Sequence, residues 1–276
     1  MKNIIVPTDF SDHAEYALKV AASLAKKNNA EILALHMLEI PNGFMTGSRE
    51  NLHDEALFFM KRARQQFERF LDKDYLKNIT VTEVVQQHPD FTHIIDKAHQ
   101  HDADLIVMGS HGASGLKETF IGSNAEKVVR TSDIPVLVVK EDTKDFRIEN
   151  FIYACDLKPE SKNAFLSALA FGTNLGAKIH LLYVNTPGER FNSTEQIEKK
   201  LEDFLGDVKD KTKDVEVHIY NDYYIERGII NLSKKFDKVL LGLGTHGRSG
   251  LAHFFRGSIS EDMVNHAKKP VITFKI

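Results

Sequence analysis

Short runs of aliphatic residues alternate along the chain with longer segments in which apolar residues recur at every third or fourth position. The short runs predict strands at residues 4–7, 32–37, 79–85, 105–108 and 136–139. The periodic segments predict helices around residues 14–25, 51–73, 91–100 and 123–130. Ser11 stands where the N-cap of the first of these helices is expected. This alternation of strand and helix predicts a parallel, doubly wound α/β sheet.

The second half of the chain repeats the pattern of the first. Asn3–Asp9 and Asn150–Asp156 align at an offset of 147 (156 minus 9). Further strands are predicted at residues 151–154, 179–184, 215–220, 239–243 and 271–274. We therefore expect two tandem domains, residues 1–143 and 147–276, each with a five-stranded parallel sheet and its own core.

A glycine pattern recurs late in each half. Gly109 and Gly112 bracket two residues, and nine more residues precede Gly122-Ser123. Gly244 and Gly247 are followed at the same spacing by Gly257-Ser258. The offset here is 135 (247 minus 112), so the first half holds 12 extra residues (147 minus 135), expected as a loop near residues 41–54.

The position of these glycines suggests phosphate binding. Open α/β sheets bind ligands at the carboxyl ends of their strands. Glycines let backbone N–H groups approach a phosphate, and a helix N-terminus that begins with Ser adds a hydroxyl and unpaired N–H donors. A single copy of this glycine pattern could be a simple turn. Two copies with identical spacing favour a loop that binds phosphate.

The Gly-x2-Gly-x9-Gly-Ser pattern, together with the opening Ile-Ile-Val-Pro-Thr-Asp, resembles the ATP-binding branch of the universal stress protein family. The resemblance covers essentially the whole chain and implies Rossmann-like domains of the adenine nucleotide alpha hydrolase type. In the first half it implies nucleotide contacts at Pro7, Thr8, Asp9, Met37, Met108, Gly109, His111, Gly112, Gly122, Ser123 and Asn124. In the second half it implies contacts at Asp156, Val184, Gly244, His246, Gly247, Gly257 and Ser258.

The second half departs from this pattern at three points. Ala154-Cys155 replaces Pro7-Thr8, Ile259 replaces Asn124, and the loop after the second strand is shorter. These differences make the first half the stronger candidate for nucleotide binding.

Composition narrows the functional classes further. The net charge of −3 lacks the basic excess of a nucleic-acid binder, and no apolar run is long enough for a membrane span. The single cysteine, Cys155, excludes an internal disulfide and indicates a reducing, cytoplasmic setting, with the thiol as inert packing. No Walker A motif, nucleophile elbow or dinucleotide fingerprint is present. No protein metal site is expected, and Mg²⁺ would be held through bound phosphates.

Several alternatives stay open at this point. Asp9 could simply cap the first helix. His111 and His246 are weak candidates for a slow ATPase or phosphotransferase, so no catalytic residue is assigned and an enzyme is not the favoured reading. A third alternative is a nucleotide-free interaction module. Phe58, Phe59, Phe67 and Phe70 are expected in the helix core.

The resemblance also implies how the protein works. It suggests a stress-response sensor that binds ATP, AMP or ADP and acts through a protein partner that the sequence does not name. It further implies that strands 136–139 and 271–274 meet, so that one chain forms an intramolecular pseudo-dimer, with a homodimer as a further assembly.

Overall fold

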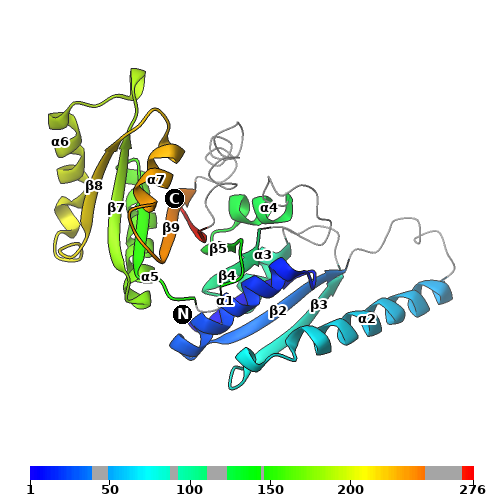
Figure 1. The fold of residues 1–276 in the computed structure, drawn as a ribbon. Coiled ribbons are helices and arrows are strands. Elements are labelled where there is room, and N and C mark those ends of the chain that lie inside the picture. The colour runs from blue at the N-terminus through cyan, green and yellow to red at the C-terminus, as the bar shows by residue number, and fades with distance from the viewer. Residues whose placement is uncertain (39–48, 88–92, 111–122, 144–145, 246–268) are drawn as a thin grey trace. The chain divides into compact units, whose positions relative to one another are not determined.

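The computed structural model of the protein describes residues 1–38, 49–87, 93–110, 123–143, 146–245 and 269–276. The chain divides into two compact units, the first made chiefly of residues up to Phe146 and the second chiefly of Arg147–Ile276. In both units helices and strands alternate along the chain (Figure 1).

Among its described residues, the first unit has five strands and four α-helices, as its sequence predicts. The strands are β1 (Asn3–Thr8), β2 (Glu31–Leu38), β3 (Val81–Gln87), β4 (Leu105–Gly109) and β5 (Val136–Val139). The helices are α1 (Asp12–Asn28), α2 (Arg49–Leu71), α3 (His93–Gln100) and α4 (Ser123–Thr131), with a short 3₁₀ turn η2 (Asp74–Leu76). The strand order is β3-β2-β1-β4-β5, and the pairing is parallel throughout.

The second unit repeats this architecture. Its strands are β6 (Asn150–Ala154), β7 (Lys178–Asn185), β8 (Glu216–Asn221), β9 (Val239–Thr245) and β10 (Val271–Lys275). Its α-helices are α5 (Lys162–Leu175), α6 (Thr194–Leu205) and α7 (Ile225–Ser233). Short 3₁₀ turns are η3 (Pro159–Ser161), η4 (Gly188–Arg190) and η5 (Gly206–Val208). The order β8-β7-β6-β9-β10, again parallel, confirms the predicted tandem α/β fold.

Matched backbone details accompany the repeat. Phe10 and Leu157 both adopt left-handed φ angles, 64° and 59°, directly after the first strand of each unit. An asparagine at the start of that strand donates side-chain hydrogen bonds to the backbone before the fourth strand: Asn3 to His101 O and Asp102 O, and Asn150 to Asp237 O. The two halves therefore share strand-end geometry as well as strand order.

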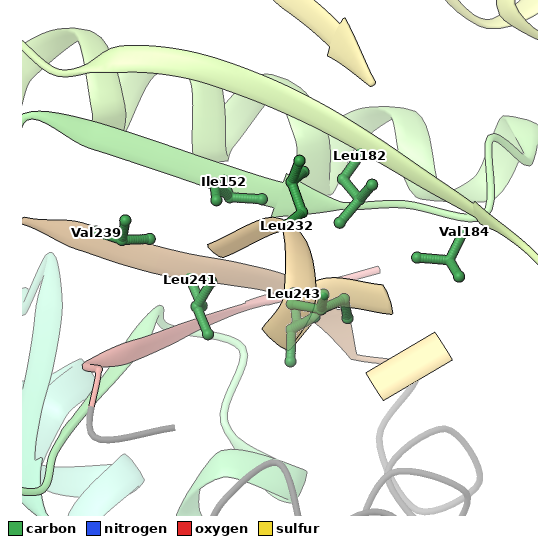
Figure 2. Packing of buried hydrophobic residues seen from close by; sticks show 8 residues of the cluster. Ile152, Leu182, Val184, Leu232, Val239, Leu241 and Leu243 are labelled. Atoms are coloured by element: carbon green, nitrogen blue, oxygen red, sulfur yellow. The ribbon is translucent and has the colours of Figure 1, made fainter. Parts of the chain in front are cut away.

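Helices cover both faces of the second sheet. Phe151 and Tyr153 of β6 point toward α5, where their rings pack against Phe171 and Phe165. Ile152 points to the opposite face and joins a buried cluster with residues of β7, α7 and β9 (Figure 2). Such burial of alternate residues on opposite faces is typical of a doubly wound sheet.

The aromatic residues of α2 differ from expectation. Phe67 and Phe70 are buried, as predicted, but Phe58 is 62% exposed, so its assignment to the core is wrong. Phe67 and Phe70 lie in the last turns of the helix, where Phe10 packs against both rings. The apolar positions of α2 therefore extend toward its N-terminal end, beyond the turns that pack against the rest of the unit.

Candidate functional site

The turn after β1 is held by its own side chains. The Thr8 hydroxyl oxygen accepts a hydrogen bond from the Phe10 N–H (3.0 Å). An Asp9 carboxylate oxygen accepts from the Ser11 N–H (3.1 Å) and from the Ser11 hydroxyl (2.5 Å). Ser11 in turn caps α1 by accepting from the Ala14 N–H. The predicted cap is confirmed at Ser11, and Asp9 supports it by accepting hydrogen bonds from Ser11.

An apolar wall lies beside this turn. The Phe10 ring packs 4.4 Å from the His36 ring and 4.9 Å from the Phe67 ring, measured between centroids. His36 Nδ1 lies 2.8 Å from the Thr8 carbonyl oxygen, which can only accept, so this nitrogen carries the proton. Burial lowers the pKa of His36 despite this hydrogen bond. A neutral, fixed imidazole therefore joins the ends of β1 and β2.

The other predicted residues of the first unit fall into three groups. Pro7 and Thr8 are buried beneath the turn, and Met37 and Met108 are almost fully covered, with Met37 only 6% exposed. Asn124 is half-buried in the first turn of α4, which begins at Ser123. His111, Gly112 and Gly122 lie outside the described residues.

Gly109 has a packing reason to be glycine. A Cβ at this position would lie 2.6 Å from the His13 carbonyl oxygen and 2.7 Å from the His13 carbonyl carbon, both backbone atoms of α1. The first turn of α1 therefore crosses closely over the end of β4. This close approach brings the N-terminal end of α1, the turn at Asp9 and the end of β4 into one corner of the unit.

The corresponding turn in the second unit carries an extra charge. One Asp156 carboxylate oxygen accepts from the Lys158 N–H (3.2 Å) and from the Ser161 hydroxyl (2.7 Å), and the other lies 3.2 Å from Lys158 Nζ. Burial opposes ionisation, yet the hydrogen bonds from Ser161 and Lys158 hold the pKa of Asp156 below its usual value. The ammonium group has no counterpart at Ser11, the equivalent position of the first unit.

Val184 serves the core of the second unit. It is 9% exposed and belongs to the buried cluster on β7, β9 and α7 (Figure 2). The close fit is visible at Gly228 of α7, where an added Cβ would lie 2.7 Å from a Val184 methyl carbon.

A network of asparagines shapes the loop after β7. Asn185 is buried, donates to Asn192 O and Asn221 Oδ1 (both 3.1 Å), and accepts from the Asn192 N–H (3.0 Å). Asn192 also donates to the Tyr183 hydroxyl. Sequence reasoning noted only that this loop is short. Its asparagines were the available signal, because such side chains commonly organise turns.

The remaining residues of the second site divide in the same way as those of the first. At Gly244, a Cβ would lie 2.7 Å from Ile276 Cδ1 and 3.1 Å from the Tyr153 hydroxyl oxygen. His246, Gly247, Gly257 and Ser258 lie outside the described residues. Burial raises the pKa of Cys155 to about 12, which keeps the thiol protonated and fits the prediction of inert packing.

Two parallel, doubly wound units with matched strand-end turns define a tandem, Rossmann-like α/β protein. The model of the universal stress protein family matches residues 1–140 and 147–275, and the chain belongs to that family. Across the described helices, none is both long enough and apolar enough to cross a membrane.

Individual proteins are similar to this chain in fold or in sequence. The crystal structure of a universal stress protein from Archaeoglobus fulgidus is similar over 99% of this chain and 98% of its own, with a TM-score of 0.69 and 20% identity. Universal stress protein MJ0531 of Methanocaldococcus jannaschii is 32% identical over 151 residues, which cover 52% of this chain and 85% of that protein. MJ0577 of the same organism is 30% identical over 160 residues, 50% of this chain and 94% of that protein.

Proposed function

We propose that the protein binds an adenine nucleotide, ATP foremost, at the carboxyl edge of each sheet and signals its bound state to a protein partner in a stress response. The observation that carries this proposal is the doubled Gly-x2-Gly-x9-Gly-Ser pattern, each copy beginning at the end of a strand beside an Asp-bearing turn. Ligands of open α/β sheets bind at this edge.

The first unit offers the parts that a nucleotide needs. Asp9 is an anionic acceptor for ribose hydroxyls at a rigid turn, and its orientation is fixed by Ser11. The N-terminus of α4, which begins at Ser123, supplies backbone N–H groups to phosphates. Glycines before it let the backbone approach the phosphate oxygens closely. Mg²⁺ fits a secondary role here, because it commonly keeps several waters and binds through substrate phosphates.

The second unit offers a modified version of the same site. The Lys158 ammonium beside Asp156 neutralises the carboxylate that would accept from the ribose. The asparagine network around Asn185 fixes the neighbouring loop without a ligand. We therefore expect the first unit to bind ATP more tightly than the second.

Signalling needs two states that the nucleotide distinguishes. ATP would favour the arrangement of the glycine loops that presents its N–H groups to the phosphates, and a ligand shifts such an equilibrium only by its differential affinity for the two states. A partner that contacts the ordered loops would then bind the ATP form more tightly, and by linkage would strengthen ATP binding to the same extent.

The proposal is tested by calorimetric titration of the purified protein with ATP, with and without Mg²⁺, alongside a phosphate-release assay. Asp9→Asn keeps one oxygen that can accept from Ser11, removes the charge, and replaces the second acceptor oxygen by an NH2 donor. Hydrogen bonds to charged groups contribute about 1.5–3 kcal/mol, so ATP affinity should fall by about 10- to 100-fold.

Gly206→Ala is a matched control for the calorimetry. Its added Cβ would meet open space, and ATP affinity should not change. Binding without turnover supports a sensor. Sustained phosphate release that is lost in His111→Ala would instead favour the slow ATPase. No binding by the wild type would overturn the proposal and favour an interaction module.

A further inference from the structure

Three ligand-type side chains meet at the outer edge of the second sheet. His180 is the third residue of β7 and pairs in register with Glu216, the first residue of β8. His218 lies two positions beyond Glu216 and therefore on the same face of the sheet. The ligand atoms of all three lie within 4.8 Å of one another. The three residues also lie toward the amino ends of their strands. His180 is about 13 Å along β7 from Val184, which lies near the carboxyl ends where the nucleotide is proposed to bind.

Hydrogen bonds fix the tautomer of His180. The Asn150 amide nitrogen donates to the Asp237 carbonyl oxygen (2.9 Å), so the Asn150 oxygen is turned toward His180. His180 Nε2 lies 3.0 Å from that oxygen and must carry the proton, since the oxygen can only accept. The lone pair of His180 is therefore on Nδ1, which faces His218 and Glu216. Metal-binding histidines are typically oriented in this way, by a hydrogen bond from the other ring nitrogen.

The spacing of the three groups suits a small tetrahedral ion. His180 Nδ1 lies 2.9 Å from His218 Nε2 and 3.5 Å from one Glu216 oxygen, and His218 Nε2 lies 3.9 Å from the other Glu216 oxygen. Ligands 2.0–2.1 Å from a tetrahedral Zn²⁺ are about 3.3–3.4 Å apart. Because the two histidines face different oxygens of Glu216, the carboxylate would have to turn to place one oxygen on a metal ion held by both rings.

Metal binding would change one tautomer and one ion pair. His218 Nε2 donates to the His180 Nδ1 lone pair, so its proton would have to move to Nδ1 of the same ring before Nε2 could bind a metal ion. Glu216 would also have to release the Lys178 ammonium.

Solvent reaches the site from one side. His180 is fully buried and its ring packs 4.4 Å from the Phe236 ring, whereas His218 and Glu216 are 19% and 43% exposed in their side chains. The opposing charges are Lys178, which pairs with Glu216, and Lys235, which follows α7. An ion would have to displace Lys178 from the carboxylate, so this lysine competes with the metal.

We propose that His180, His218 and Glu216 form a binding site for one divalent transition-metal ion, Zn²⁺ in particular, with water as the fourth ligand. Two imidazoles with one carboxylate are a known ligand set for zinc, whereas Mg²⁺ prefers oxygen ligands in octahedral geometry. The site stands apart from the nucleotide edge, so it does not depend on the proposed ATP binding.

The test is a calorimetric titration of the untagged protein with ZnCl₂, repeated with MgCl₂, and a Co²⁺ titration followed by visible absorption. We expect one Zn²⁺ per chain, no Mg²⁺ bound here, and the absorption of tetrahedral Co²⁺. Substituting a residue that hydrogen-bonds to a metal ligand lowers metal affinity by about 10–100-fold. Removing a ligand itself, in His218→Ala, should therefore lower Zn²⁺ affinity by at least that much. Glu216→Gln should also weaken binding.

Two further variants separate a metal site from a structural histidine pair. Lys178→Gln should bind Zn²⁺ more tightly than the wild type, because the competing ammonium is gone. His101→Ala, at an exposed histidine of the first unit, should leave Zn²⁺ affinity unchanged. Far-UV circular dichroism confirms that each variant is folded. Equal Zn²⁺ affinity in folded His218→Ala and wild type, or the absence of tetrahedral Co²⁺ absorption, would overturn the proposal.

Discussion

The turns after β1 and β6 have the same backbone conformation but different side-chain chemistry. Phe10 and Leu157 take the same left-handed conformation, and in each turn an aspartate accepts from a serine hydroxyl at the start of the following helix. The second turn adds an ammonium group from Lys158, at the position that Ser11 occupies in the first turn. The turn is thus a property of the fold, whereas the charge offered to a ligand is a property of each copy.

The motif glycines show a second contrast. Gly109 and Gly244 occupy equivalent positions, but an added Cβ would meet backbone atoms of His13 in the first unit and side-chain atoms of Ile276 and Tyr153 in the second. Backbone at a helix start cannot move without disturbing its packing, while a terminal side chain can rotate. Equivalent positions in a repeat therefore tolerate change differently.

Two large effects on stability are expected, and one follows from this contrast between Gly109 and Gly244. Gly109→Ala should destabilise the first unit by about 1–3 kcal/mol through overpacking. Gly244→Ala should cost less than about 1 kcal/mol, because Ile276 can give way. Urea unfolding of both variants, followed by circular dichroism, measures the difference. Equal losses would show that the two corners are packed alike.

Acid should destabilise the second unit more than the first. Burial lowers the pKa of His180 to about 4, while an unfolded histidine titrates near about 6.5. The unfolded state therefore binds the proton first, so the stability is present above about pH 6.5 and is lost as the pH falls toward about 4. The loss is on the order of 2–3 kcal/mol.

Unfolding free energies of wild type and His180→Gln across this pH range test the acid effect. The variant should show a weaker pH dependence. His36 of the first unit shifts in the same direction but keeps its bond to the Thr8 carbonyl, so His36→Gln serves as the comparison. A wild type with no pH dependence in this range would contradict the account.

The smallest expected effect concerns Lys158. The ion pair with Asp156 is partly exposed, and such pairs contribute about 0.2–1 kcal/mol. Lys158→Ala should therefore change the unfolding free energy by no more than this, and should raise the pKa of Asp156. NMR titration of the Asp156 carboxyl carbon measures the shift. An unchanged pKa would mean that the Ser161 hydroxyl and the backbone N–H of residue 158 stabilise the carboxylate without the ammonium group.

Much of the fold could be predicted from the sequence because periodicity and repetition agreed. The apolar runs located all ten described strands, and the offset between Asp9 and Asp156 located the second unit. The exposed Phe58 was missed, because a helical period does not show where the covering sheet ends.

The sites were less predictable than the fold. Asp9 and Ser11 could be placed, since strand-end turns and N-caps are local. The Lys158 pair, the Asn185 network and the meeting of His180 with Glu216 depend on contacts between segments distant in sequence or on side-chain directions. The sequence signal for the last was a glutamate and a histidine two apart on one strand, beside a histidine on its neighbour.

A count of ATP sites tests the central claim most directly. Calorimetric titration of the wild type, Gly122→Ala and Gly257→Ala should show two sites in the wild type and one in each variant. The remaining site should be tighter in Gly257→Ala, which keeps the first unit intact. A wild type that binds no ATP, or variants that both retain two sites of unchanged affinity, would contradict the account.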